Sequence, residues 1–352
     1  MPVLPTLHFA EVSIYGETSL PRGCYSCTME TRAPLRPASI CLLAGYFAVA
    51  TAALAQQSVD LSFDVKVANP AYTAKHPRVL VDEAHFNVHT SGGEYKPFAA
   101  LVTNDGYEVL PNTKPFDAAS LVGADVLVIA SARGAARPSE LPAFTEAECD
   151  AVRDWVRAGG NLLLITDHYP IGHGSENLSR RFDVSMSKGT TSDSAHAAPG
   201  AGGPSALLFS RENNLMAGHP ITDGRNATER INKVILFTGQ SLKGPEGSVA
   251  FLKLADTATD RMESWAGTAG TPGQTRRSRG PAANVPQVSA AGRSQGLALV
   301  FGAGRVVVMG EASELSAQVA GPQKRPMGMN YPGIDNRQMA LNIMHWLSRL
   351  IE

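Results

Sequence analysis

Acidic, imidazole, hydroxyl, amide and guanidinium side chains recur directly after the apolar runs of this chain. In chain order they are Asp82, Glu83, His85, His89, Ser131, Arg133, Asp167, His168, His173, Gln240 and Glu311. Imidazoles and carboxylates together can bind zinc or a similar divalent ion, which polarises a carbonyl group or generates hydroxide at neutral pH. Without a metal, the same groups can serve as general acid and general base. Their spacing matches no motif such as His-Glu-x-x-His, so both possibilities stay open.

Position within the chain suggests a role for each group. The candidate catalytic residues are Asp167, His168, His85 and Glu311. The candidate metal ligands are His85, His89 and His168. The candidate ligand-binding residues are Asp82, Glu83, Arg133 and Gln240. Structural roles are the alternative, since carboxylates cap turns and helices, and imidazoles hydrogen-bond to loop backbone.

The stretch Gly159–Gly174 indicates how the fold would position such groups. Leu162–Ile165 is continuously apolar, as expected for a strand buried on both faces of a parallel sheet. Asp167 and His168 follow the carboxyl end of this run, where ligands bind in open α/β sheets.

Apolar runs alternate with helical segments from residue 77 onward. The expected strands are 77–81, 107–110, 125–130, 162–165, 233–237, 249–254, 296–301 and 305–309. This alternation predicts an α/β fold with right-handed crossovers and a doubly wound, mostly parallel sheet. Thr145 and Glu148 form a capping box for the helix before residue 162, and 338–350 is a C-terminal helix. Gly302–Gly304 would join the last two strands as a hairpin.

Parallel strands place their carboxyl ends on one edge of the sheet. Asp82 and Glu311 should therefore lie on the same rim, with His85 and His168 facing a common cleft. Residues 185–204 are rich in Gly, Ser, Thr and Ala without a pattern, and they would cover this cleft as a lid-like loop.

The N-terminal region has the three parts of a secretory signal peptide. After Met29, which we take as the start, Arg32 and Arg36 precede the apolar run 40–54 and an Ala-Leu-Ala site that ends at Ala55. The run is shorter than the roughly 20 residues of a membrane-spanning helix. We expect residues 1–55 to be a leader that is removed near Ala55, leaving a secreted or periplasmic protein without a membrane span.

Composition describes the remainder as an ordinary globular chain. Of the 352 residues 43% are hydrophobic and 18% charged, and a formal net charge of −1 argues against a nucleic-acid partner and leaves a small molecule as the expected ligand. Cys149 is the one cysteine after the leader, which excludes a cysteine metal cluster. Residues 56–76 form a polar lead and 77–352 a single domain, in which 267–293 is a predicted disordered insertion because it contains few large apolar residues.

The succession VLVDEAHFNVHT, YEVL, ADVLVIA, DWVRAGGNLLLITDH and FGAGRVVVMGEA resembles the class I glutamine amidotransferase-like superfamily, which has a flavodoxin-like fold, in a secreted branch. At the fold level it is also similar to trehalose-utilisation-type proteins and intraflagellar-transport-like domains of that superfamily. The resemblance covers residues 77–350. Amidotransferases of this fold carry a nucleophilic cysteine after a strand, whereas the corresponding strand end here reads Thr166-Asp167-His168. The resemblance therefore implies the fold without glutamine hydrolysis through a thiolate.

Two functions of different classes fit these observations. The first is an exported hydrolase that acts on a small polar or carbohydrate-like substrate through the His/Asp/Glu cluster, with or without a divalent metal such as zinc. The second is a non-catalytic module that binds a ligand or partner at the same strand ends. A close-set, hydrogen-bonded His85, Asp167 and His168 would favour the enzyme, and residues that turn away from one another would favour the module.

The leader yields a first prediction. A chain expressed from Met29 should be exported and trimmed to begin at Gln56, because the basic, apolar and small-residue parts of the signal are all in place. N-terminal sequencing of protein from the exported fraction checks this. An intact N-terminus on that protein would contradict it.

Overall fold

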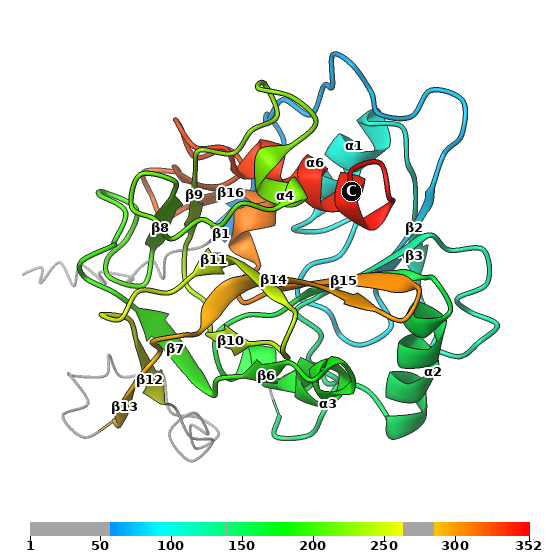
Figure 1. Cartoon of the computed structure of the whole chain (residues 1–352), viewed down its shortest axis with the longest axis horizontal. Coiled ribbons are helices and arrows are strands. Elements are labelled where there is room, and N and C mark those ends of the chain that lie inside the picture. Colours follow the sequence, from blue (N-terminus) through cyan, green and yellow to red (C-terminus); the bar gives the residue numbers. More distant parts are fainter. Residues whose placement is uncertain (1–56, 138, 263–284) are drawn as a thin grey trace, which may run out of the picture. The chain divides into compact units, whose positions relative to one another are not determined.

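A nine-stranded sheet lies at the centre of the protein (Figure 1). The structure is a computed structural model that describes residues 57–352 except 138 and 263–284. Five neighbouring strands of this sheet are parallel, in the order β3 (Glu108–Asn112), β2 (Arg78–Asp82), β4 (Val126–Ala130), β5 (Asn161–Ile165) and β15 (Gly304–Met309). This parallel part corresponds to the predicted α/β core.

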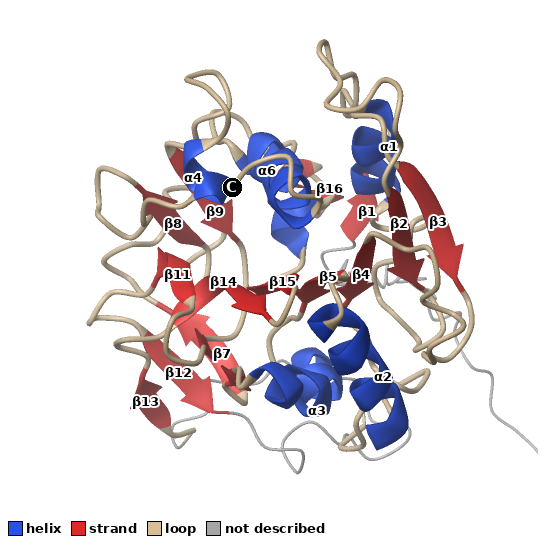
Figure 2. Ribbon diagram, turned by 45° about the vertical axis from the view of Figure 1, so that its right-hand side comes forward, coloured by secondary structure: helices blue, strands red, loops and turns tan. Residues whose placement is uncertain are grey.

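Helices cover both faces of the parallel strands (Figure 2). Alternate residues of β5 serve the two faces: Leu163 and Ile165 belong to the core beneath α1 (Lys96–Asn104) and α6 (Asn336–Leu347), and Leu162 and Leu164 to the core beneath α2 (Glu146–Arg157). All five residues of the strand are buried. The uninterrupted apolar run therefore has the physical cause that the sequence suggested, because neither face of the strand meets water.

Helix α2 begins with the predicted capping box. The hydroxyl of Thr145 accepts the backbone N–H of Glu148, and the Glu148 carboxylate accepts the backbone N–H of Thr145. Cys149, one residue further on, is fully buried, and burial raises the pKa of its thiol to about 12. The thiol therefore stays protonated at neutral pH and is not a nucleophile.

The other half of the sheet is antiparallel, so the prediction of a mostly parallel sheet holds only in part. From β15 the sheet continues through β14 (Ser294–Phe301), β10 (Leu242–Lys243) and β6 (Ser185–Met186), and β11 (Val249–Lys253) also pairs with β14. The predicted hairpin between β14 and β15 is present. It reverses the chain, and each strand beyond it then pairs in the antiparallel sense.

Strand β9 (Lys233–Leu236) is the clearest correction to the expected topology. It was expected within the parallel sheet, but it forms a separate antiparallel pair with β8 (Leu207–Ser210). Its apolar residues pack instead against α6 and its surroundings. An apolar run specifies that a strand is buried, and it does not specify which sheet the strand joins.

Residues 185–204 contain regular structure where a patternless loop was expected. Strand β6 joins the central sheet, and β7 (Gly189–Ser192) pairs with β12 (Thr259–Met262). The hydroxyl of Thr191 donates to the buried Asp260 carboxylate at 2.6 Å. Strands held by such polar contacts show no apolar alternation.

The predicted disordered insertion 267–293 lies largely outside the described residues. The prediction does not hold for Gln287–Ser289, which form β13 beside β12. The remaining short elements are β1 (Gln57–Val59), β16 (Ala317–Ala320), β17 (Arg325–Gly328), α3 (Glu176–Ser179), α4 (Pro220–Asp223) and 3-10 turns at Ile171–Ser175, Arg180–Phe182 and Ser313–Leu315. In the described part of the chain, no helix has both the length and the apolar character needed to cross a bilayer.

The capping box yields a second prediction. Thr145→Ala should lower the free energy of unfolding by about 1 kcal/mol, since it removes the side-chain acceptor of the first turn. Urea denaturation of the wild type and the variant measures this difference. Thr145→Ser keeps the acceptor and is the matched control. Equal losses in both variants would show that the hydroxyl cap is not what stabilises the helix.

Candidate functional site

The parallel pairing places the carboxyl ends of β2, β4, β5 and β15 at one edge of the sheet. Backbone hydrogen bonds join the loops that leave this edge. Val88 N–H donates to the Ser131 carbonyl, and the N–H groups of Arg133 and Gly134 donate to the His85 carbonyl. The loop after β4 is joined in turn to the loop after β5, where Ala143 N–H donates to the Gly174 carbonyl. The three loops thus form one continuous rim.

His85 is held at both ring nitrogens. Its Nδ1 lies 2.8 Å from Asp82 Oδ1, and its Nε2 lies 2.8 Å from Glu148 Oε1 on α2. The ring is buried between the side chains of Phe116 and Phe144. Burial lowers the pKa of His85, but the two carboxylates outweigh it and raise the pKa above its ordinary value. An imidazolium bridging two carboxylates is a structural clamp, because no ring nitrogen is left for a substrate.

Three of the candidate ligand-binding groups also have internal partners. Asp82 accepts from His85 and from Asn87 Nδ2, which lies 2.9 Å away. Glu83 accepts the backbone N–H and the hydroxyl of Ser91. Gln240 donates through Nε2 to the Thr166 hydroxyl at 2.9 Å, which brings its loop to the end of β5. These contacts hold the rim together, and they leave Arg133 as the candidate ligand-binding group with the fewest partners.

Asp167 and His168 lie beyond the end of β5. Asp167 is nearly enclosed, and burial raises the pKa of its carboxyl to about 7; the charge of His168 opposes this shift and that of Glu311 adds to it. His168 is more open, with 35% of its side chain exposed, and its Nε2 lies 3.7 Å from Asp167 Oδ1. Because His168 Nδ1 lies 2.8 Å from the Tyr169 carbonyl, which can only accept, Nδ1 carries the proton and Nε2 is the basic nitrogen of the neutral ring.

Two glutamates at the end of β15 complete an acidic cluster with Asp167. Glu311 accepts backbone N–H groups from Phe237, Ser313 and Glu314, so its negative charge is well stabilised. Glu314 is fully buried. Burial, followed by the charge of Glu311, raises the pKa of Glu314 well above its ordinary value. The protonated form of Glu314 is therefore favoured.

Tyr95 lies near the acidic cluster, and His89 contacts Tyr95. The Tyr95 hydroxyl donates to the Ala312 carbonyl at 2.7 Å, and its ring contacts the His89 ring with centroids 4.7 Å apart. Burial, with the charges of Glu314, Glu311 and Asp167, raises the pKa of Tyr95 well above its ordinary value. Burial lowers the pKa of His89 to about 4, so this imidazole is neutral at physiological pH.

The candidate residues therefore divide into two sets. Asp167, His168 and Glu311 belong together, while His85 is tied to Asp82 and Glu148. Within the described residues, no three His, Cys, Asp or Glu side chains form a group able to hold a metal ion. The predicted ligand set of His85, His89 and His168 is not assembled, because each ring has a different partner.

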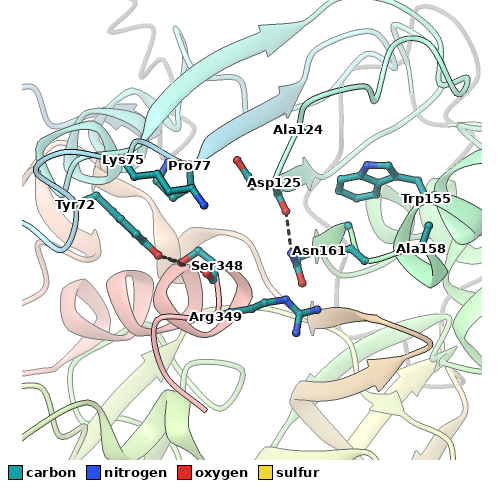
Figure 3. Close-up of a pocket in the computed structure, with 12 residues that line it drawn as sticks. Tyr72, Lys75, Pro77, Ala124, Asp125, Trp155, Ala158, Asn161, Ser348 and Arg349 are labelled. Atoms are coloured by element: carbon teal, nitrogen blue, oxygen red, sulfur yellow. Dashed lines mark hydrogen bonds between the residues drawn. The ribbon is translucent and has the colours of Figure 1, made fainter.

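A cavity of about 350 Å³ lies at the opposite, amino edge of the sheet (Figure 3). Pro77, Asp125 and Asn161 line it at the starts of their strands, together with Trp155 and Arg349. The Asn161 amide donates to the Asp125 carbonyl at 2.9 Å across this edge. The cavity does not include the acidic cluster, and we expect the chemistry at the perturbed carboxyl groups rather than in this cavity.

Sequence reasoning did not identify Glu148, Glu314 or Tyr95 as neighbours of the site. Glu148 was recognised as a helix cap, and its contact with His85 joins residues 63 positions apart. Glu314 lies three residues after Glu311, a spacing that could have suggested a carboxyl pair. Tyr95 precedes α1, and no motif or spacing in the sequence pointed to it as a site residue.

No family model matches the chain, and no curated protein matches its sequence. Among solved structures, it is similar to the mmIFT52 N-terminal domain, with 13% identity and a TM-score of 0.51, covering 77% of this chain and 97% of that domain. A ThuA-like protein from Bacteroides uniformis matches at 13% identity and a TM-score of 0.39, over 79% and 94% of the two chains. A GMP synthase-type protein from Thermoplasma acidophilum matches at 11% identity and a TM-score of 0.39, over 79% and 97% of the two chains.

The first of these likenesses shows the fold alone, and it agrees with the fold-level resemblance to intraflagellar-transport-like domains. The other two proteins have amidotransferase-like folds. Their TM-scores are too low to assign this chain to a family.

The buried carboxyl of Asp167 yields a third prediction. Its pKa of about 7 in the folded protein exceeds the value of about 3.9 in an unfolded chain, so the folded state binds the proton more tightly. This contribution to stability is complete below about pH 4 and is lost as pH rises through about 7. Asp167→Asn should therefore lose less stability than the wild type between about pH 5 and pH 8, as measured by denaturant unfolding.

Asp193→Asn is the matched control. Hydrogen bonds from Thr257 and His196 outweigh burial and lower the pKa of Asp193, so this carboxyl does not titrate in the tested range. A wild-type pH profile that Asp167→Asn leaves unchanged would show that Asp167 is ionised throughout.

Proposed function

We propose that the protein is an exported hydrolase in which Asp167 and His168 form the acid–base pair. The observation that carries this proposal is the Asp167 carboxyl, whose pKa lies near 7 at the carboxyl edge of the sheet. A group with this pKa can both donate and accept a proton at physiological pH. Strongly shifted carboxyls concentrate at functional sites, and Asp167 shares its surroundings with Glu311 and Glu314.

The geometry supports different roles for the two residues, with His168 as the general base and Asp167 as its partner or as the general acid. The His168 side chain is partly exposed and its Nε2 carries no proton in the neutral ring, so this nitrogen can take a proton from an attacking water. The resulting imidazolium lies beside Asp167, whose carboxylate would stabilise it at 3.7 Å. Alternatively the neutral Asp167 carboxyl can deliver its proton to a leaving group. The charge of Glu311 raises the pKa of Asp167 and so favours retention of the Asp167 proton.

The substrate that we propose is a small polar or carbohydrate-like molecule. The protein would meet it outside the cytoplasm, after removal of the leader near Ala55. Within this proposal the chain belongs to a secreted branch of the amidotransferase-like superfamily, where an acid and a histidine follow the strand that carries cysteine in amidotransferases.

A binding module without catalysis is the second candidate, and the state of His85 favours it. The imidazole with the most carboxylate neighbours is locked at both nitrogens, and Asp82, Glu83 and Gln240 are likewise engaged. A site whose polar groups are mostly satisfied internally can still hold a ligand. The two candidates differ in turnover and not in binding.

The fourth prediction separates them. The wild type, assayed with chromogenic esters, phosphates, amides and glycosides, should hydrolyse at least one class, and His168→Ala and Asp167→Asn should each lower kcat/KM by about 100-fold or more. The folds of both variants should remain intact, because the two residues lie beyond the strand and their removal opens no core cavity. Circular dichroism and thermal unfolding check that condition.

Asp256→Asn is the matched control, since this aspartate is exposed and lies in the turn between β11 and β12, in none of the three rim loops. It should keep wild-type kcat/KM. Absence of turnover in the wild type across all four classes, or full activity in both site variants, would favour the binding module.

A further inference from the structure

Phe86 is an exposed aromatic residue in a backbone conformation that such residues rarely adopt. Its φ angle is 53°, in the left-handed region, and 54% of the residue is exposed. A bulky side chain at positive φ is strained, and exposure of an aromatic ring to water adds a second cost. Phe86 belongs to none of the apolar clusters formed by the described residues, so burial in a core does not offset either cost.

The residues on either side of Phe86 hold it in this conformation. His85 is clamped between Asp82 and Glu148. Asn87 is buried, its side-chain Nδ2 donates to Asp82, and its side-chain Oδ1 accepts the backbone N–H of His85. Two fixed neighbours leave the intervening residue no freedom to relax. The clamp therefore presents the Phe86 ring to solvent on a rigid turn, as strained residues at binding sites are presented.

Arg133 stands beside this turn, on the neighbouring loop. Its Nε donates to the Phe86 carbonyl at 3.1 Å, and its backbone N–H donates to the His85 carbonyl. No carboxylate pairs with Arg133 in the described part of the chain. One edge of the guanidinium is thus anchored on the Phe86 turn, and its terminal N–H groups are open to a ligand.

Nearby carboxylates do not compete for this guanidinium. Asp82 is satisfied by His85 and Asn87, and Glu83 is satisfied by Ser91. The loop of Arg133 also holds Ser131, which has a φ of 49° and a buried hydroxyl with no hydrogen-bond partner among the described residues. A second strained residue and an unused hydroxyl next to the same turn indicate that the rim is shaped for a ligand.

We propose that Phe86 and Arg133 form the recognition element of the rim and select a molecule that has a flat or sugar ring and an anionic group. The Phe86 ring offers a stacking surface, and the Arg133 guanidinium binds a carboxylate or phosphate through paired N–H donors. This inference rests on the proposed function, since it names the substrate class of the same site. The loops after β2 and β4 would hold the molecule, while the loop after β5 carries Asp167 and His168.

Binding to the Asp167→Asn variant tests the inference without turnover. The probes are 4-nitrophenyl β-D-glucuronide, which has rings and a carboxylate, and 4-nitrophenyl β-D-glucoside, its neutral counterpart. Calorimetric titration should show the glucuronide binding about tenfold more tightly, the effect of one charge-assisted contact. Arg133→Gln, added to this variant, should abolish the preference without changing the affinity for the glucoside.

Phe86→Asn is the second added substitution, because asparagine accepts the left-handed conformation. It should weaken both probes about tenfold while the melting temperature stays the same or rises, since the strain is relieved. A fall in melting temperature would instead assign Phe86 a structural role and overturn its part in recognition. Arg230→Gln and Val300→Ser, at exposed positions elsewhere, are the matched controls and should leave both affinities unchanged.

Equal affinity for the two probes, or a glucuronide preference that survives Arg133→Gln, would overturn the inference. Its failure is distinguishable from failure of the proposed function. Turnover by the wild type tests the acid–base pair, whereas binding by Asp167→Asn tests the rim alone.

Discussion

The imidazole of His85, held between the carboxylates of Asp82 and Glu148, is the contact on which the candidate site depends. The ring connects the end of β2 to the first turn of α2. The backbone carbonyl of His85 accepts two N–H groups from the loop after β4. Buried imidazolium and carboxylate groups are stable only as a paired set, because each alone would lose its hydration without compensation. Removing one of the three side chains would leave a buried charge without its partner. The clamp explains how strain at Phe86 persists in the folded protein.

Burial disfavours the charged form in both sets of ionisable groups, but only in the first set do neighbouring groups outweigh it. Around His85, charges of both signs are present, and hydrogen bonds hold the charged forms in place. Around Asp167, Glu311 and Glu314, three acidic groups share a poorly hydrated space with little positive charge, so the protonated form is favoured at two of them. The first set serves structure because it is electrostatically satisfied. The second can serve chemistry because the Asp167 carboxyl, with a pKa of about 7, can exchange its proton at neutral pH.

The two edges of the sheet also differ in how far their polar groups are hydrogen-bonded within the protein. The amino edge has a cavity, but its polar groups, such as Asn161, Asp125 and Ser348, are hydrogen-bonded to one another and to their surroundings. The carboxyl edge has the perturbed carboxyls and an open guanidinium. The volume of a cavity shows only where a molecule would fit, whereas polar groups without internal partners indicate which chemical groups a ligand would need. We therefore assign the function to the carboxyl edge.

The sequence by itself determined the local elements. The run Leu162–Ile165 is apolar because both faces of its strand are buried, the capping box at Thr145 starts its helix, and the late hairpin follows from its glycines. Only the tertiary structure decided that β9 leaves the main sheet, that His85 binds Glu148, and that Asp167 meets Glu311. The physical reason is the separation along the chain of the residues that interact. Periodicity and capping depend on residues a few positions apart, so they can be recognised in the sequence. Pairing between strands and the burial of a carboxyl depend on residues far away in the chain, which a single sequence does not identify.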